Sequence, residues 1–258
     1  MLNRFDPARL RSVIVAALIV GLLAGLASAV LHSITGEPLV RDAITLEEAR
    51  SATGATSAGG HGAAEPELVS RSVQSGPGLF TAMGLSGAVF GLLFGLAFWG
   101  LRSAQPHPFR RALWAGMILF GSITLAPWLK YPPNPPAVGD PDTLGRRQGL
   151  YVSLIALSLA VGLVGAALAG LLRRRGWPEH RRVAAVAVAV AVTFAIAMAV
   201  LPPAPDLVDA PATLIWRFRL ASLAGSALLW AVLSVGFGAL VAERTGERAA
   251  VECTELVR

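Results

Sequence analysis

The residue types best suited to binding a metal ion gather in one polar stretch, residues 36–77. Its carboxylates flank a middle rich in glycine, alanine and serine that holds one histidine, and another histidine precedes the stretch. Carboxylates and imidazole suit divalent cobalt, nickel or zinc, and an acidic vestibule concentrates cations. The candidate metal ligands are His32, Glu37, Asp42, Glu47, Glu48 and His61. A solvated acidic face without a bound metal is the alternative interpretation.

A serine inside an apolar run is the second candidate for chemistry. Gly84-Leu85-Ser86-Gly87 resembles the nucleophile motif of rhomboid intramembrane proteases. An intramembrane serine needs a base within hydrogen-bond reach, but the apolar runs that follow contain no histidine. An intramembrane serine protease is therefore a remote alternative. The sequence also lacks HExxH, CxxC and Walker-type motifs, so we expect neither an enzyme nor a resident cofactor.

The composition indicates a membrane protein. Of the 258 residues, 54% are apolar and 15% are charged, whereas a soluble domain carries about 25% charged residues. A single cysteine excludes a disulfide framework within the chain. The net charge of +6 does not indicate a nucleic-acid partner, because the basic residues lie beside apolar runs and do not form one exposed face.

Six apolar runs are long enough to cross a bilayer as helices, which takes about 20 apolar residues each. None of them contains Asp, Glu, Lys or Arg. The sequence therefore predicts an all-α polytopic membrane protein in which residues 1–258 form a single integral membrane domain. The expected spans are Ser12–Thr35, Gly78–Leu101, Ala112–Leu129, Leu150–Leu172, Val183–Leu201 and Leu220–Ala242.

The charges between the spans predict the orientation, because positive residues are retained on the cytoplasmic side. The N-terminus, the second and fourth connections and the C-terminal tail carry 14 of the 22 Lys and Arg residues. The other side carries 10 of the 16 acidic residues, which gives net charges of +8 and −2. We expect both termini in the cytoplasm, a long acidic outer loop at 36–77 and a cytoplasmic tail at 243–258. Cleavage of the first span as a signal peptide is the alternative for the N-terminus.

Two of the expected outer loops are copies of each other at an offset of 70 residues. Residues 132–147 and 202–217 are identical at 8 of 16 positions, where chance gives about one or two. Hairpins 112–172 and 183–242 are therefore predicted repeats, and the first two spans a degenerate third copy. Copies with an even number of spans insert in the same orientation, around an axis along the membrane normal. The repeat residues are Pro132, Pro133, Asp140, Asp142, Thr143, Arg147, Pro202, Pro203, Thr213 and Arg217.

The two arginines that end the repeated loops, Arg147 and Arg217, are expected to hold the loop aspartates. Duplication for packing alone is the alternative explanation of the repeat. Small residues spaced by four favour close helix packing where lipid gives no hydrophobic drive. The residues expected at such contacts are Gly21, Gly25, Gly87, Gly91 and Gly95.

The loop sequences carry a resemblance to a known family. Residues 37–44, 128–147 and 216–223, with Glu47-Glu48, closely resemble the CbtA-type cobalt transporter subunits, and the resemblance extends over nearly the whole chain. It implies a bacterial inner-membrane protein that moves cobalt inward for cobalamin synthesis, and a small single-helix partner, CbtB, that bears histidines. It also implies five helices, where the apolar runs predict six.

The family's histidine-rich outer stretch is reduced here to His61, which shifts metal capture toward the partner. The leading hypothesis is a membrane subunit of a divalent transition-metal uptake system, with cobalt or another divalent cation as the transported ligand. The alternative is a non-transporting scaffold that organises a partner in the membrane. Membrane lipid is an expected partner under both hypotheses.

Overall fold

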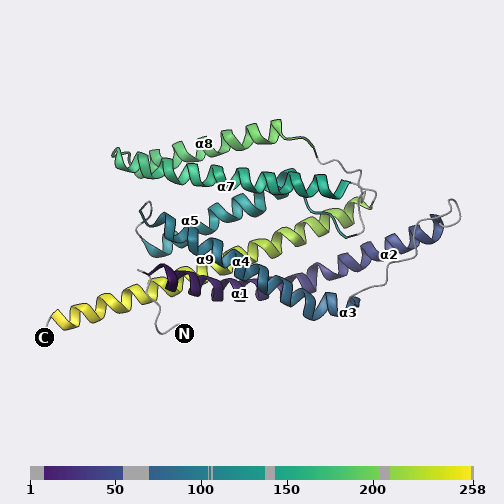
Figure 1. Cartoon of the computed structure of the whole chain (residues 1–258), viewed down its shortest axis with the longest axis horizontal. Helices are drawn as coiled ribbons and strands as arrows, with labels where there is room; N and C mark the ends of the chain where they lie inside the picture. Colours follow the sequence, from purple (N-terminus) through teal and green to yellow (C-terminus); the bar gives the residue numbers. More distant parts are fainter. Residues whose placement is uncertain are drawn as a thin grey trace.

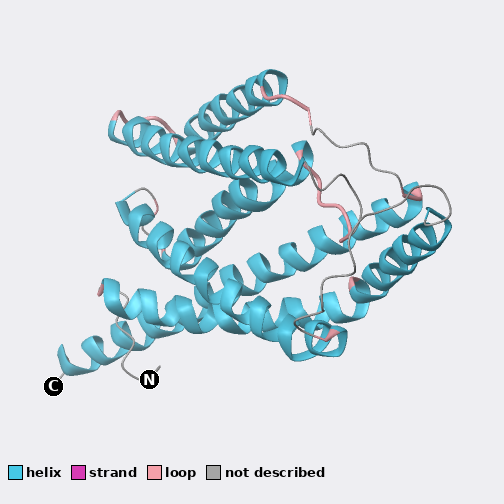
Figure 2. Cartoon of the chain, turned by 45° about the vertical axis from the view of Figure 1, so that its right-hand side comes forward, coloured by secondary structure: helices cyan, strands magenta, loops and turns pink. Residues whose placement is uncertain are grey.

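The computed structural model describes residues 9–54, 70–103, 105, 107–136, 143–203 and 210–256. Every regular element in these ranges is a helix (Figure 2). The helices are α1 (Leu10–Thr35), α2 (Glu37–Gly54), α3 (Arg71–Val73), the π-helical η2 (Gln74–Gly78), α4 (Leu79–Gly100), the 3-10 turn η3 (Leu101–Ser103), α5 (Pro108–Leu119), the π-helical η4 (Phe120–Leu125), α6 (Ala126–Lys130), α7 (Leu144–Arg174), α8 (Glu179–Val200) and α9 (Ala212–Leu256). The prediction of an all-α protein is confirmed.

Six helical stretches among the described residues are long and apolar enough to cross a membrane, so the six expected spans are confirmed in number and place. Five helices, the number that the resemblance implies, is not what the chain forms. The stretches are Leu10–Thr35, Arg71–Gly100, Pro108–Lys130, Gly145–Arg174, Glu179–Val200 and Ala212–Gly246. The helix of the sixth span continues to Leu256, into the expected C-terminal tail.

The chain runs back and forth along one direction, which gives the bundle two distinct ends (Figure 1). The start of α1, the end of α9 and the α4–α5 and α7–α8 connections share one end. We call it the arginine-rich end, after Arg102, Arg110, Arg111, Arg173, Arg174, Arg175, Arg181 and Arg182. The loop end, opposite, holds α2 and the segments that follow α6 and α8.

Helices α1, α4, α5 and α9 form the packed core. Three buried aromatic rings pack at its centre, with the ring of Phe237 lying 5.3 Å from that of Phe94 and 5.0 Å from that of Phe98. Glycines bring α1 and α4 into backbone contact: a Cβ added to Gly21 would lie 2.8 Å from Gly91 Cα, and one on Gly87 would lie 2.7 Å from Gly25 Cα. At Gly95 the nearest atoms are those of the Ala17 and Ile14 side chains, at 3.1 Å.

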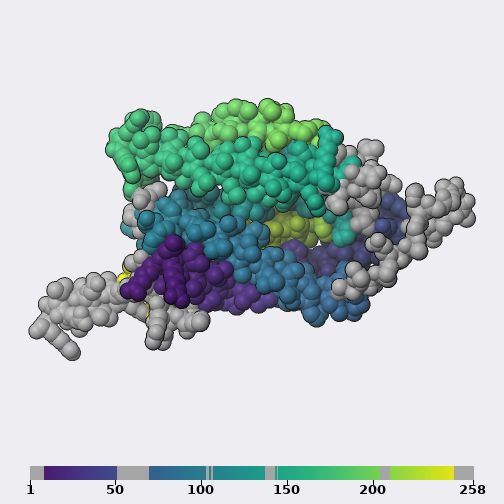
Figure 3. All heavy atoms as spheres, in the orientation of Figure 1, coloured from purple at the N-terminus to yellow at the C-terminus, as the bar shows by residue number. Residues whose placement is uncertain are grey.

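Helices α7 and α8 form a separate layer over α5, seen at the top of Figure 3. Helix α8 contains no buried residue and packs mainly on α7. Several of its apolar side chains, among them Val188, Val192 and Ile196, are more than half exposed. In a membrane these side chains face lipid, so this layer is bound to the core along one side only.

The third span is broken by η4, at the place where it must contact two layers. The Ser122 hydroxyl donates to the Ser158 carbonyl of α7 over 3.0 Å, and the Thr124 hydroxyl oxygen accepts from Trp230 Nε1 of α9 over 3.0 Å. A π-helical turn inserts one residue into the helix and rotates the faces on either side of it. The turn therefore lets one helix present polar side chains to the core and to the outer layer.

The two repeated hairpins differ in their surroundings. Pro132 and Pro133 are half-buried and Pro202 and Pro203 are exposed, while Arg147 is half-buried and Arg217 exposed. Helix α5 packs chiefly on α9, and α8 chiefly on α7. Thr143 ends the first loop just before α7, and Thr213 lies in the first turn of α9. Asp140 and Asp142 lie outside the described residues, so the expected pairing of the loop aspartates with the two arginines stays a prediction.

Candidate functional site

His32 lies near the end of α1, with its ring packed against the backbone of Gly225 in α9. A side chain on Gly225 would overlap the imidazole, so only glycine leaves room for it. The ring nitrogen Nδ1 lies 2.9 Å from the Ser28 carbonyl oxygen, and the Ser28 hydroxyl donates to the Gly225 carbonyl over 2.8 Å. Because a carbonyl can only accept, Nδ1 is the donor in this contact, and in the neutral imidazole the lone pair then lies on Nε2.

Glu37, the first residue of α2, is buried and forms an ion pair with Arg71. The Arg71 guanidinium donates to Glu37 Oε2 over 2.7 Å, and the two side chains are 36% and 11% exposed respectively. Arg71 also donates to Gln74 Oε1 over 3.3 Å. The pair joins the start of α2 to the entry into the second span. The Glu37 carboxylate is therefore neutralised within the chain.

The other acidic candidates point to solvent. Asp42, Glu47 and Glu48 are exposed on α2, so the first part of the expected acidic outer loop is a helix. Asp42 and Arg217 line one hollow of about 250 Å³ beside Leu46 and Leu214. His61 lies outside the described residues. Across the ranges that the structure describes, His, Cys, Asp and Glu side chains form no group of three that could hold a metal ion.

A set of hydrogen bonds that the sequence did not reveal closes the loop end. Tyr131, just after α6, donates its hydroxyl to the Pro202 carbonyl over 2.8 Å, so the two repeated loops contact each other. Lys130 Nζ donates to the Met198 carbonyl over 2.7 Å, where a positive charge is favoured by the C-terminal end of α8. Burial raises the pKa of the Tyr131 hydroxyl above its ordinary value.

Arg219 holds the same loop from α9. Its guanidinium donates to Asn134 Oδ1 over 2.8 Å and to the Pro133 carbonyl over 3.3 Å. The Arg219 carbonyl accepts from Trp128 Nε1 over 3.0 Å. The repeat drew attention to Arg217, but Arg219, two residues later, makes these contacts. We refer to Trp128, Lys130, Tyr131 and Arg219 together as the loop-end latch.

The protease-like motif is built differently from a catalytic site. Gly84 and Gly87 are buried, with Gly87 against the α1 backbone, whereas Ser86 is exposed on the opposite side of α4. His107 and His180 lie at the arginine-rich end. The described residues therefore give Ser86 no histidine base, and the glycines around it serve helix contact.

Comparison with known proteins identifies the family. The model of one family, described as probable cobalt transporter subunit (CbtA), matches residues 10–242. No curated protein and no solved structure matches the chain. The family is one of transporter subunits and not of enzymes, and the term subunit implies a partner within a transporter complex. Because the match spans nearly all of the six membrane-crossing helices, the chain belongs to the CbtA family of probable cobalt transporter subunits.

Proposed function

We propose that this chain is the membrane subunit of a divalent-metal uptake system, with cobalt as the ion and cobalamin synthesis as its use. It lies in the bacterial inner membrane with both termini in the cytoplasm, so the loop end faces outward. A small single-helix subunit that bears histidines completes the system. The observation that carries the proposal is the family match over residues 10–242.

The charge distribution supports this orientation and role. The loop end carries α2, on which the carboxylates of Asp42, Glu47 and Glu48 are exposed to solvent. An acidic surface raises the local concentration of cations. These side chains gather the ion, and the partner's histidines supply the imidazole ligands that this chain lacks in number.

His32 and Glu37, which lie nearer the membrane, extend the proposed path of the ion. His32 presents the lone pair of Nε2, because Nδ1 donates to Ser28. Glu37 is released for a cation only when Arg71 leaves it. A divalent ion that displaces the guanidinium gains a carboxylate ligand, so we propose the Glu37–Arg71 pair as the point where the ion leaves the acidic surface and enters the bundle.

A non-transporting scaffold is the second candidate. The membrane-crossing helices support it, because their central parts hold hydroxyls and no carboxylate. Ser122 and Thr193 donate to backbone carbonyls, and the described residues hold no cluster of three metal ligands. A scaffold would seat the partner in the membrane and leave the ion to it.

Cobalt accumulation in cells that produce the chain and its partner separates the two functions. We expect the triple variant Asp42→Asn, Glu47→Gln, Glu48→Gln to lower uptake at limiting cobalt and to lose less at saturating cobalt. Glu243→Gln is the control. It neutralises an exposed carboxylate of α9 at the arginine-rich end of the bundle and should leave uptake unchanged. If the triple variant transports like the unmodified chain at every concentration, the carboxylates do not gather the ion.

A further inference from the structure

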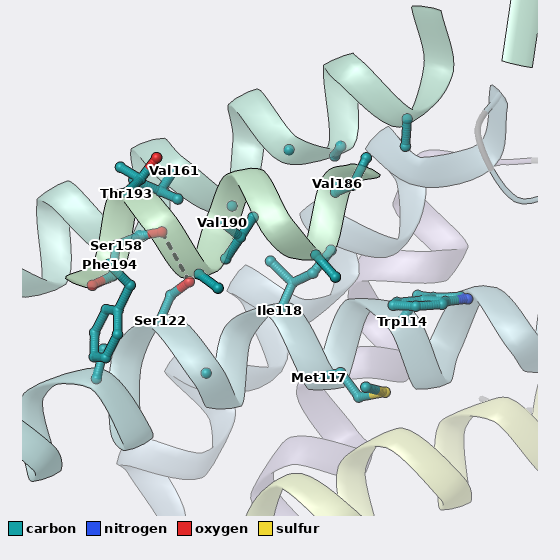
Figure 4. Close-up of a pocket in the computed structure, with 18 of the residues that line it drawn as sticks. Trp114, Met117, Ile118, Ser122, Ser158, Val161, Val186, Val190, Thr193 and Phe194 are labelled. Atoms are coloured by element: carbon teal, nitrogen blue, oxygen red, sulfur yellow. Dashed lines mark hydrogen bonds between the residues drawn. The ribbon is translucent and has the colours of Figure 1, made fainter. Parts of the chain in front are cut away.

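An apolar groove runs between the core and the outer layer. It has a volume of about 510 Å³ and lies between α5, η4 and α6 on one side and α7 and α8 on the other. Figure 4 shows Trp114 and Met117 toward one end of it and Ser122, Ser158 and Phe194 toward the other. The Ser122 and Thr193 hydroxyls on its wall donate to the backbone carbonyls of Ser158 and Ala189, so the middle of the groove offers a hydrocarbon surface.

The charged side chains that line the groove lie at its arginine-rich end. Glu179 and Arg182 line it there, one turn apart on α8. Arg110 of α5 forms an ion pair with Glu179 across the mouth, which neutralises that carboxylate. Arg182 is half-buried, and no ion pair of it is found among the described residues. Four further arginines at or beside the α7–α8 connection are exposed and do not line the groove: Arg173, Arg174, Arg175 and Arg181.

The length of the groove and the charge at its mouth favour a lipid. From Arg182 to Ala197, both on the groove wall, α8 rises about 22 Å, which exceeds the depth of about 15 Å of one leaflet of a bilayer. The groove is therefore long enough for an acyl chain. An anionic lipid also supplies a phosphate for Arg182 at the end of that chain, which an apolar helix does not.

We propose that the groove binds one anionic phospholipid, with its phosphate at Arg182 and an acyl chain between α5 and α8. Basic pockets between membrane helices on the cytoplasmic side bind anionic lipid headgroups. The exposed Trp177 beside the mouth places this end at the headgroup level, where tryptophan is enriched. The lipid fills the space that separates the outer layer from α5 and so fixes α8, which lacks buried residues of its own.

Native mass spectrometry of the purified full-length chain tests the proposal. The chain is incubated with phosphatidylglycerol or with phosphatidylcholine of the same acyl chains, and the bound lipid is counted. We expect one retained phosphatidylglycerol per chain. Loss of one arginine near a headgroup corresponds to about a fivefold weaker affinity, so Arg182→Gln should weaken retention by that factor. Arg181→Gln removes the same charge from the neighbouring exposed residue and should change retention less than about twofold.

A second pair of variants tests the acyl chain. Ala191 lines the groove and Ala195 does not. Ala191→Phe should fill the groove and abolish retention, whereas Ala195→Phe, on a lipid-exposed position of α8, should keep it. Far-ultraviolet circular dichroism and elution volume establish that all four variants fold. Equal retention of the two lipids, or equal effects of the two arginine changes, would overturn the proposal. If the unmodified chain is a dimer and Ala191→Phe makes it a monomer, the groove is a contact between two copies of the chain, and this result would overturn the proposal as well.

Discussion

Gly21 and Gly87 lie with their backbones in contact, so that a Cβ built on either would overlap the carbonyl oxygen of the other. The overlap involves backbone on both sides, which cannot move aside as a flexible side chain can. Close approach of α1 and α4 therefore depends on the absence of these two side chains, and α1 is an integral part of the core.

Gly87→Val should lower the stability of the bundle by separating α1 from α4. Overpacking a close contact costs about 1–3 kcal/mol and here meets backbone, so we expect a lower melting temperature in detergent. Gly170→Val is the matched control, because no neighbouring atom lies within 4 Å of a Cβ at Gly170. Equal melting temperatures of the two variants would show that the α1–α4 contact does not limit stability.

Arg219→Gln should open the loop-end latch. The change removes charged donors from Asn134 and Pro133, and hydrogen bonds to charged groups contribute about 1.5–3 kcal/mol. Arg217→Gln removes the same charge from an exposed side chain and should cost no more than about 0.5 kcal/mol. Thermal unfolding of both variants tests the ranking, and a larger loss in the Arg217 variant would return the anchoring role to that residue.

Tyr131→Phe should remove the hydrogen bond between the two repeated loops, at a cost of about 0.5–1.5 kcal/mol. Burial raises the pKa of Tyr131, so the neutral hydroxyl persists in the folded chain beyond the ordinary tyrosine pKa of about 10. A raised folded-state pKa contributes stability that is complete below the unfolded pKa and is lost as the pH rises through the folded pKa.

Melting curves between pH 8 and pH 11.5, a range set by the ordinary tyrosine pKa of about 10, test this dependence. The difference between the unmodified chain and the Phe variant should be constant at the lower pH values and shrink at the highest. The other tyrosine of the chain, Tyr151, is present in both proteins and therefore cancels from the difference. A difference that stays constant to the highest pH would contradict the role of the Tyr131 hydroxyl.

Arg71→Gln should destabilise the chain more than Glu37→Gln. The Glu37 side chain is 11% exposed and that of Arg71 36%, so the carboxylate is the more costly group to leave unpaired. We expect the arginine variant to lose about 1–3 kcal/mol. The unfolding free energies of the two single variants and the double variant give the interaction energy between Arg71 and Glu37. A larger loss of stability for Glu37→Gln than for Arg71→Gln would contradict the prediction.

The parts of the fold that were predictable follow from the bilayer itself. Six uncharged apolar runs must each form a helix, because backbone groups in lipid have no other partner, and the structure contains these six spans. The helix that packs against each span was not predictable, because the spacing of small residues shows which face of a helix makes a close contact but not with which other helix. The layer of α7 and α8 and the groove below it could therefore be found only from the structure.

The candidate site was less predictable than the fold, for a related reason. Glu37 was identified by its charge as a candidate metal ligand, and nothing in the sequence indicated its ion pair with Arg71, 34 residues away. Arg219 was overlooked because the repeat aligns Arg217 with Arg147, whereas the side chain that reaches the loop is set by the rotation of α9. The sequence does not give the rotation of a helix about its own axis closely enough to tell Arg217 from Arg219. Arg219 is identified as the anchoring residue only by its hydrogen bonds to Asn134 and Pro133.

Cobalt flux into proteoliposomes is the most direct measurement of transport. The purified chain, alone and with its single-helix partner, is reconstituted into vesicles that contain a cobalt-quenched dye. We predict that vesicles with both subunits take up cobalt faster than empty vesicles and that magnesium is not taken up. Cobalt entry no faster than into empty vesicles, with both subunits folded and inserted, would contradict a transport role for this chain.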